Sequence, residues 1–176
     1  MNKIVKTIIA VPLAVVCVLV LFFVIGLFMM NRPMTQVSDH ALTYQEYKEQ
    51  FRGTNIPPSA SNIWYAWSSV GMGGRAHIFK FEAPLDDCTA FAKREFNHYV
   101  KQSYDNPTDY PSDDLVPLKE RPDDPRSRLT HYGLKKLDWF DFERITNGLT
   151  IARPRSHLPH LWIDVDRSTL YSYWTD

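Results

Sequence analysis

Cysteine is scarce in this sequence, and three common catalytic or phosphate-binding motifs are missing. Only Cys17 and Cys88 are present among the 176 residues. Because Cys17 lies inside a long apolar run, we expect no disulfide between the two, and a lone Cys88 in an oxidising compartment is expected to be buried in the core. The motifs G-x-S-x-G, H-E-x-x-H and the phosphate-binding P-loop do not occur. We therefore expect neither enzyme activity nor a cofactor.

Acidic residues are absent from the first part of the chain. No aspartate or glutamate precedes Asp39, although the whole sequence has 20 acidic and 20 basic residues. The part after Arg32 holds 17 of the basic residues and all 20 acidic ones, a formal charge of −3 with neutral histidines. A mildly acidic domain repels phosphate backbones, so nucleic acid is not an expected partner.

Residues 7–30 contain no charged side chain at all, and 16 of these 24 residues are isoleucine, leucine, valine or phenylalanine. As a helix the segment would be about 36 Å long, which exceeds a hydrocarbon core of about 30 Å. Its insertion into a bilayer is favourable by about 5 to 10 kcal/mol. The run is too long for a cleaved signal peptide and ends without a small-x-small cleavage site. We expect an uncleaved transmembrane helix.

The flanking charges indicate the orientation of this helix. Lys3, Lys6 and the amino terminus precede the apolar run, whereas Arg32 alone follows it. This difference favours a cytoplasmic segment at residues 1–6. The protein is then expected in the inner, or cytoplasmic, membrane as a single-pass protein, with the domain of residues 59–176 outside the cytoplasm.

Residues 31–58 are predicted to form a stalk with one short helix. Thr43 and Glu46, in "TYQE", fit a capping box, in which the two side chains satisfy free amides of the first helical turn. Apolar residues at helical spacing follow, and Gly53 is expected to end the helix. A helix this short is not stable alone, so it must pack on the domain or on lipid headgroups.

The domain is expected to have an α+β fold, in which an antiparallel sheet of about five strands carries one main helix on one face. Two strands precede the helix, and a loop and three strands follow it. The expected ranges are strands 62–69 and 75–82, helix 86–103, loop 103–128, and strands 149–153, 160–165 and 169–175. The "GMGG" glycines are expected to turn the first hairpin. The loop has six aspartates, five prolines and no periodicity, which predicts a long polar surface loop.

Large apolar side chains point to both faces of the first strand, since Trp64 lies between Ile63 and Tyr65. The face with Ile63 and Tyr65 is expected to pack against the helix. The opposite face is predicted to hold Trp64, Ile78, Trp162 and one row of the last strand, either Tyr171 and Tyr173 or Leu170 and Trp174. This face is either covered by the stalk helix and the long loop, or it is an open surface that binds a protein or an envelope glycan.

A second group of residues supports an alternative function. His157 and His160 have a spacing found in metal sites, and Asp164 follows four residues later. These three residues would form the site of a metal-dependent or hydrolytic envelope enzyme. The alternative competes with our main interpretation, a membrane-anchored protein whose domain binds a protein or envelope component without catalysis.

Three stretches carry a resemblance to known proteins: "IPPSASNIWYAW", "FKFEAPLDD" and "LWIDVDRSTLYSYWTD". The chain resembles a diffuse group of uncharacterised bacterial small domains of the membrane-anchored or lipoprotein type, which open with a P-x-S-A-x-N/D-I phrase. The matching residues are Pro57 or Pro58, Ser59, Ala60, Asn62 and Ile63. The resemblance implies a bacterial origin and a similar sheet, and it carries no functional residue over to this sequence.

Overall fold

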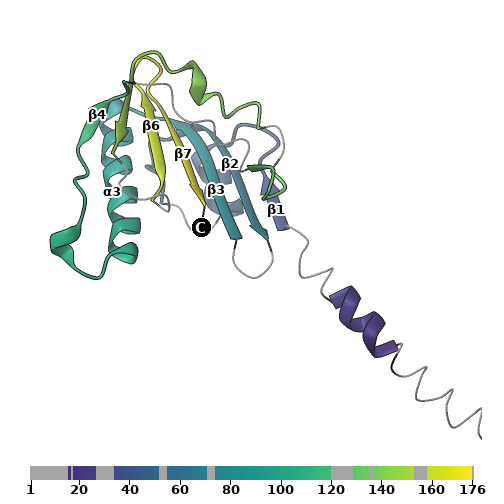
Figure 1. Ribbon diagram of the computed structural model, residues 1–176. Coiled ribbons are helices and arrows are strands. Elements are labelled where there is room, and N and C mark those ends of the chain that lie inside the picture. The colour runs from purple at the N-terminus through teal and green to yellow at the C-terminus, as the bar shows by residue number, and fades with distance from the viewer. Residues whose placement is uncertain are drawn as a thin grey trace, which may run out of the picture.

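A computed structural model of the chain describes residues 16, 18–26, 34–51, 55–70, 74–119, 129–134, 137–152 and 158–175. Its main feature is an antiparallel sheet of seven strands in the order β1-β2-β3-β7-β6-β5-β4 (Figure 1). In chain order the elements are β1 (Met34–Val37), α2 (Tyr44–Gln50), β2 (Ser61–Val70), β3 (Gly74–Glu82), α3 (Leu85–Ser103), the 3₁₀ helix η1 (Pro107–Asp109), β4 (Leu115–Pro117), the 3₁₀ helix η2 (Phe142–Arg144), β5 (Gly148–Ile151), β6 (His160–Asp164) and β7 (Thr169–Thr175). The predicted α+β class is confirmed.

The sheet is larger than the predicted five strands because a short strand is added at each edge. β1 and β4 are these edge strands, and both lie in segments that were predicted to contain no strand. β7 lies between β3 and β6, so the last described strand of the chain occupies the middle of the sheet.

The segment predicted as a stalk belongs to the folded domain. β1 pairs with β2, with Met34 opposite Ser69 and Val37 opposite Ala66. The fold therefore includes described residues from 34 on, which the prediction had assigned to a stalk before residue 59. Alternation alone could not show this, because a four-residue strand with every residue exposed has no apolar pattern.

The predicted capping box of α2 is confirmed. The hydroxyl oxygen of Thr43 accepts from the backbone N–H of Glu46, and the Glu46 carboxylate accepts from the backbone N–H of Thr43. α2 ends at Gln50, and Gly53, its predicted end, lies outside the described residues. The short helix is held by packing, since the ring of Tyr47 lies 5.9 Å from that of Tyr65.

One face of the sheet packs against both α2 and α3. α3 has an apolar side that includes Cys88, Phe91 and Phe96, all of them fully buried. The rings of Phe79 and Phe81 on β3 each meet Phe91 edge-on, at 5.6 and 5.3 Å. The sequence predicted that this face of the sheet packs against the helix, and the contacts confirm that prediction.

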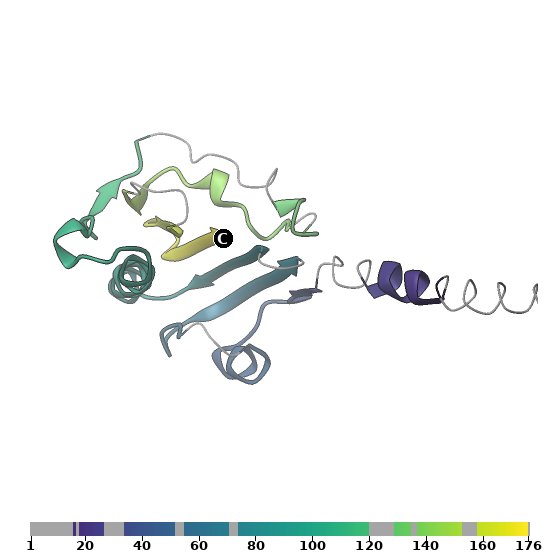
Figure 2. The same cartoon turned by 60° about the horizontal axis from the view of Figure 1, so that its bottom comes forward.

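The opposite face is covered by residues 129–134 and 137–145, which we name the roof segment. Figure 2 shows the green part of the chain that contains much of it lying across the sheet from α2. Its buried apolar side chains are Leu129, Tyr132, Leu134, Leu137, Phe140 and Phe142. The second face is thus covered, as one of our two alternatives stated, but chiefly by the roof segment. α2 packs on the other face, and Leu118 of the predicted long loop packs against the core of this one.

The region predicted as a long polar loop, residues 103–128, has secondary structure in its described part. It contains η1 and β4, and Leu115 of β4 lies opposite Ile151 of β5. Pro117 fits this position because an edge strand tolerates a residue that cannot donate a hydrogen bond. Residues 120–128 lie outside the described part of the chain.

Val16 and residues 18–26 are helical, and Figure 1 shows them apart from the sheet. They carry nine of the twelve exposed large hydrophobic side chains of the described residues, between 48% and 70% exposed. Within the described ranges, no helix has both the length and the apolar character needed to cross a bilayer. Most of the predicted transmembrane helix, residues 7–30, is outside those ranges.

Candidate binding cleft

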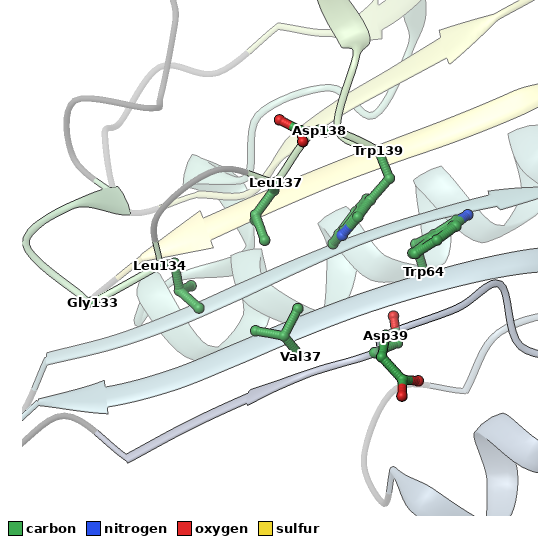
Figure 3. A pocket seen from close by; sticks show the side chains of 9 residues that line it. Val37, Asp39, Trp64, Gly133, Leu134, Leu137, Asp138 and Trp139 are labelled. Carbon is green, nitrogen blue, oxygen red and sulfur yellow. The ribbon is translucent and has the colours of Figure 1, made fainter.

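A cleft of about 360 Å³ opens between the β1 edge of the sheet and the roof segment (Figure 3). Its lining residues are Val37, Ser38, Asp39 and Trp64 from the sheet side, and Gly133, Leu134, Leu137, Asp138 and Trp139 from the roof segment. The cleft therefore joins parts of the chain that are about 70 to 100 residues apart in the sequence.

Two tryptophans form the aromatic end of the cleft. The indole rings of Trp64 and Trp139 stack at a centroid distance of 5.8 Å with an interplanar angle of 19°. Both side chains are half-buried. Such a pair offers a flat apolar surface together with N–H donors at its rim.

An irregularity at the start of β2 sets the orientation of Trp64. Asn62 has φ of 49°, and the register with β3 shifts between Ser61 and Trp64. A bulge of this kind re-aims the neighbouring side chains, and asparagine tolerates the left-handed backbone better than most residues. The Asn62 amide accepts from the Trp64 indole N–H at 3.3 Å and donates to the Glu82 carboxylate at 2.6 Å.

A polar network beneath the cleft positions Trp139. The Lys80 ammonium group donates to the backbone carbonyl of Trp139 at 3.2 Å and to the carboxylate of Asp141 at 2.8 Å. The hydroxyl of Tyr171 donates to the same carboxylate at 3.1 Å. Burial by itself would raise the pKa of Asp141, but the hydrogen bond and charge of Lys80 outweigh it and lower that pKa below its ordinary value.

Two carboxylates lie at the margins of the cleft. Asp39 forms a 2.5 Å hydrogen bond with His40, and this bond lowers the pKa of Asp39. Asp138 is exposed on the roof side. In Figure 3 both carboxylate groups are turned away from the two indole rings. The cleft thus has an apolar centre and acidic edges.

β1 forms the open border of the cleft. It is the last strand of the sheet on this side, so its outer edge has no strand partner in the described part of the chain. Val37 lies opposite Ala66, whose side chain belongs to the core beneath the roof segment. Val37 therefore points to the cleft side of the sheet, and its side chain is 44% exposed.

Most residues predicted for binding lie in the core. Ile78, Trp162, Tyr171 and Tyr173 share the predicted face, but they are at most 4% exposed because the roof segment covers them. Trp162 stacks on Phe142 at 4.8 Å. These four side chains belong to the core beneath the roof segment, and none of them lines the cleft.

Of the predicted binding residues, Trp64 alone lines the cleft. Trp139, Leu134 and Leu137 were missed because they lie in a segment with no helical or strand periodicity. The available signal was the density of aromatic residues in "LDWFDFER", which is unusual for a surface loop.

The residues of the predicted metal site are not brought together. His160 and Asp164 are at opposite ends of β6, about 13 Å apart along the strand. Asp164 is buried and accepts from the backbone N–H groups of Asp166 and Arg167, so it shapes the turn before β7. His157 lies outside the described residues. Within those residues no group of three or more potential ligands can hold a metal ion.

Cys88 is fully buried, as predicted. Its burial raises the pKa of the thiol to about 11. A protonated thiol of this kind is a poor nucleophile at neutral pH. Cys88 is therefore a core residue on the helix side of the sheet.

Comparisons with known proteins do not assign the chain to a family. No family model, no curated protein and no solved structure matches it. The resemblance to bacterial membrane-anchored domains stays a prediction, and the function is argued from the cleft.

Proposed function

We propose that this protein is a single-pass, membrane-anchored binding protein. Its extracytoplasmic domain binds an extended segment of a partner protein along β1 and in the cleft, without catalysis. The observation that carries the proposal is the stacked pair of Trp64 and Trp139 beside an open strand edge.

The anchor is the apolar run of residues 7–30. The run has no charge, and its described residues 18–26 are helical with exposed apolar side chains. Exposed apolar side chains in such number are favourable in lipid and unfavourable in water. Lys3 and Lys6 before the run favour a cytoplasmic N-terminus, which puts the domain on the opposite side of the membrane.

The open edge of β1 favours an extended peptide as the ligand. A strand added to a sheet edge gains main-chain hydrogen bonds, and alternate side chains then enter pockets on one face. Here one such set of side chains would pass Val37 and approach Leu134 and Trp64. The charges of Asp39 and Asp138 at the margins favour a peptide with lysine or arginine beside its apolar residues.

Binding fits the surrounding groups better than catalysis does. Lys80 and Asp141 neutralise each other beneath Trp139, and Tyr171 donates to the same carboxylate. The two marginal carboxylates are turned away from the rings (Figure 3). No pair of these groups is aimed at a common point inside the cleft, which acid–base chemistry would need.

A random dodecapeptide library displayed on phage tests this function on the full chain in detergent micelles. We expect the selected peptides to have apolar residues at alternate positions with basic neighbours. Their affinity, measured by titration of synthetic peptides against tryptophan emission, should fall about tenfold or more in Trp64→Ala and in Trp139→Ala, because buried aromatic contacts dominate such interfaces.

Trp174→Ala is the matched control, since Trp174 is also half-buried but lies outside the cleft. Its affinity for the selected peptides should stay within about twofold of the parent chain. Circular dichroism checks that each variant is folded. Failure to select any peptide, or equal binding by folded Trp64→Ala and Trp139→Ala variants, would contradict the proposal.

A further inference from the structure

A row of rings crosses three strands on the helix side of the sheet, away from the cleft. Trp67 of β2 lies opposite His77 of β3, and His77 lies opposite Trp174 of β7. Their ring centroids are 6.5 and 5.5 Å apart, and Tyr99 of α3 continues the row at 4.9 Å from Trp174. We name these four residues the aromatic row.

Each of the four side chains of the aromatic row is half-buried, and the row lies at one end of the sheet. Met34 of β1 and Arg75 of β3 are paired with the same residue of β2, Ser69, two positions nearer that end. Met34 is 66% exposed, and Arg75 is also exposed. This end of the domain therefore combines large rings, an exposed methionine and a cation.

The same end is tied closely to the apolar run. The run ends at Met30 and β1 begins at Met34, so the connection can span at most about 14 Å. The headgroup layer on one side of a bilayer is about 5 to 8 Å thick. Since the aromatic row lies only about 7 Å from Met34 along the strand direction, the connection keeps it near the membrane surface.

We propose that the aromatic row and Arg75 rest against the lipid headgroups of the membrane that holds residues 7–30. This inference rests on the anchor proposed above. Tryptophan and tyrosine rings favour the interface between water and hydrocarbon, and arginine is attracted to anionic headgroups. The contact fixes the orientation of the domain, and the cleft, which lies on the opposite face, stays open to a partner outside the membrane.

Quenching of tryptophan emission tests this contact on the full chain. The probe is a nanodisc of phosphatidylcholine and phosphatidylglycerol that contains phosphatidylcholine spin-labelled at its headgroup. All five tryptophans lie in the domain, so two double variants can be matched. Trp67→Phe with Trp174→Phe removes the indoles of the aromatic row, and Trp64→Phe with Trp139→Phe removes those of the cleft.

We expect the fraction of emission that is quenched to fall at least twofold when the aromatic-row indoles are removed. The cleft variant should keep or increase that fraction, because it retains Trp67 and Trp174, the two indoles that are expected to contact the headgroups. Equal quenched fractions in the two variants, in chains that float with the nanodiscs, would overturn this contact and leave the anchor in place. A chain that does not float with the nanodiscs would overturn both the anchor and the contact.

Discussion

The Lys80 ammonium group holds the roof segment to the sheet. Its side chain is only 14% exposed, and it lies 5.3 Å from the centre of the Tyr171 ring as well as bonding to Asp141. A cation over an aromatic face adds a further attraction to the charge pair. Removing one member of such a buried pair is costly because the other charge then stays buried without its partner.

Replacing Asp141 by asparagine should lower the free energy of unfolding by about 1 to 3 kcal/mol at neutral pH. The pKa of Asp141 is lowered in the folded state, so the stabilisation is present above the ordinary carboxyl pKa of 3.8 and is lost as the pH falls through the lower folded value. The difference between parent and variant should therefore shrink in that acidic range. Urea unfolding of a fragment of residues 31–176 at several pH values measures it.

Asp138→Asn is the control for this prediction, because Asp138 is exposed in the same segment. It should change the free energy of unfolding by no more than about 0.5 kcal/mol. A loss as large as that of Asp141→Asn would show that the charge of the segment matters and the contact with Lys80 does not.

Alternation along the strands correctly predicted which side chains share a face. Trp64, Ile78 and Trp162 do point to one side of the sheet, and Tyr171 and Tyr173 join them. What covers that face could not be predicted in this way. The burial of Trp162 depends on Phe140 and Phe142, and such a contact between distant segments leaves no period in either of them.

α2 is the element whose local sequence is most informative. Its capping box was predicted from Thr43 and Glu46, and a helix of seven residues depends on such a cap because its own hydrogen bonds are few. Tyr47 and the helix-ending Phe51 then hold it against Tyr65, whose ring lies 4.2 Å from that of Phe51.

Thr43→Ala should destabilise the domain by about 1 kcal/mol, because the first-turn amide of Glu46 loses its acceptor. Hydrogen exchange of the α2 amides should speed up more than that of the β3 amides. Thr43→Ser keeps the hydroxyl and should restore most of the protection. Uniform loss of protection across the sheet in both variants would speak against a local capping effect.

The roof segment shows where local information is insufficient. Its described residues hold the short helix η2, turns and a helical position at Leu129, and neither a period of two nor one of 3.6 marks the segment. Its place in the fold comes from tertiary contacts, among them the bond from the Ser68 hydroxyl to the Tyr132 carbonyl at 2.5 Å. The same is true of the cleft, since five of its nine lining residues come from this segment.

In the molecule as a whole, the order of the strands in the sheet differs from their order along the chain. β1 comes from the start of the domain and lies at an edge, whereas β7 comes from its end and lies in the centre. Seven residue pairs join β7 to β3 and five join it to β6. The two halves of the sheet are therefore held together by β7.

A chain that ends at residue 168 should not fold, because β3 and β6 lose their shared neighbour and both cores lose side chains of β7. A fragment of residues 31–176 should fold, since it keeps every strand of the sheet. Circular dichroism and cooperative urea unfolding distinguish the two. Cooperative unfolding of the chain that ends at residue 168 would show that β7 is dispensable.

The central position of β7 also determines when the domain can mature in the cell. While the ribosome is still making residues 104–168, the strands already synthesised lack the neighbour that completes their sheet. Their tryptophans, tyrosines and phenylalanines remain available to chaperones and to other nascent chains during that time. The sheet can therefore close around its centre only after β7 has been synthesised.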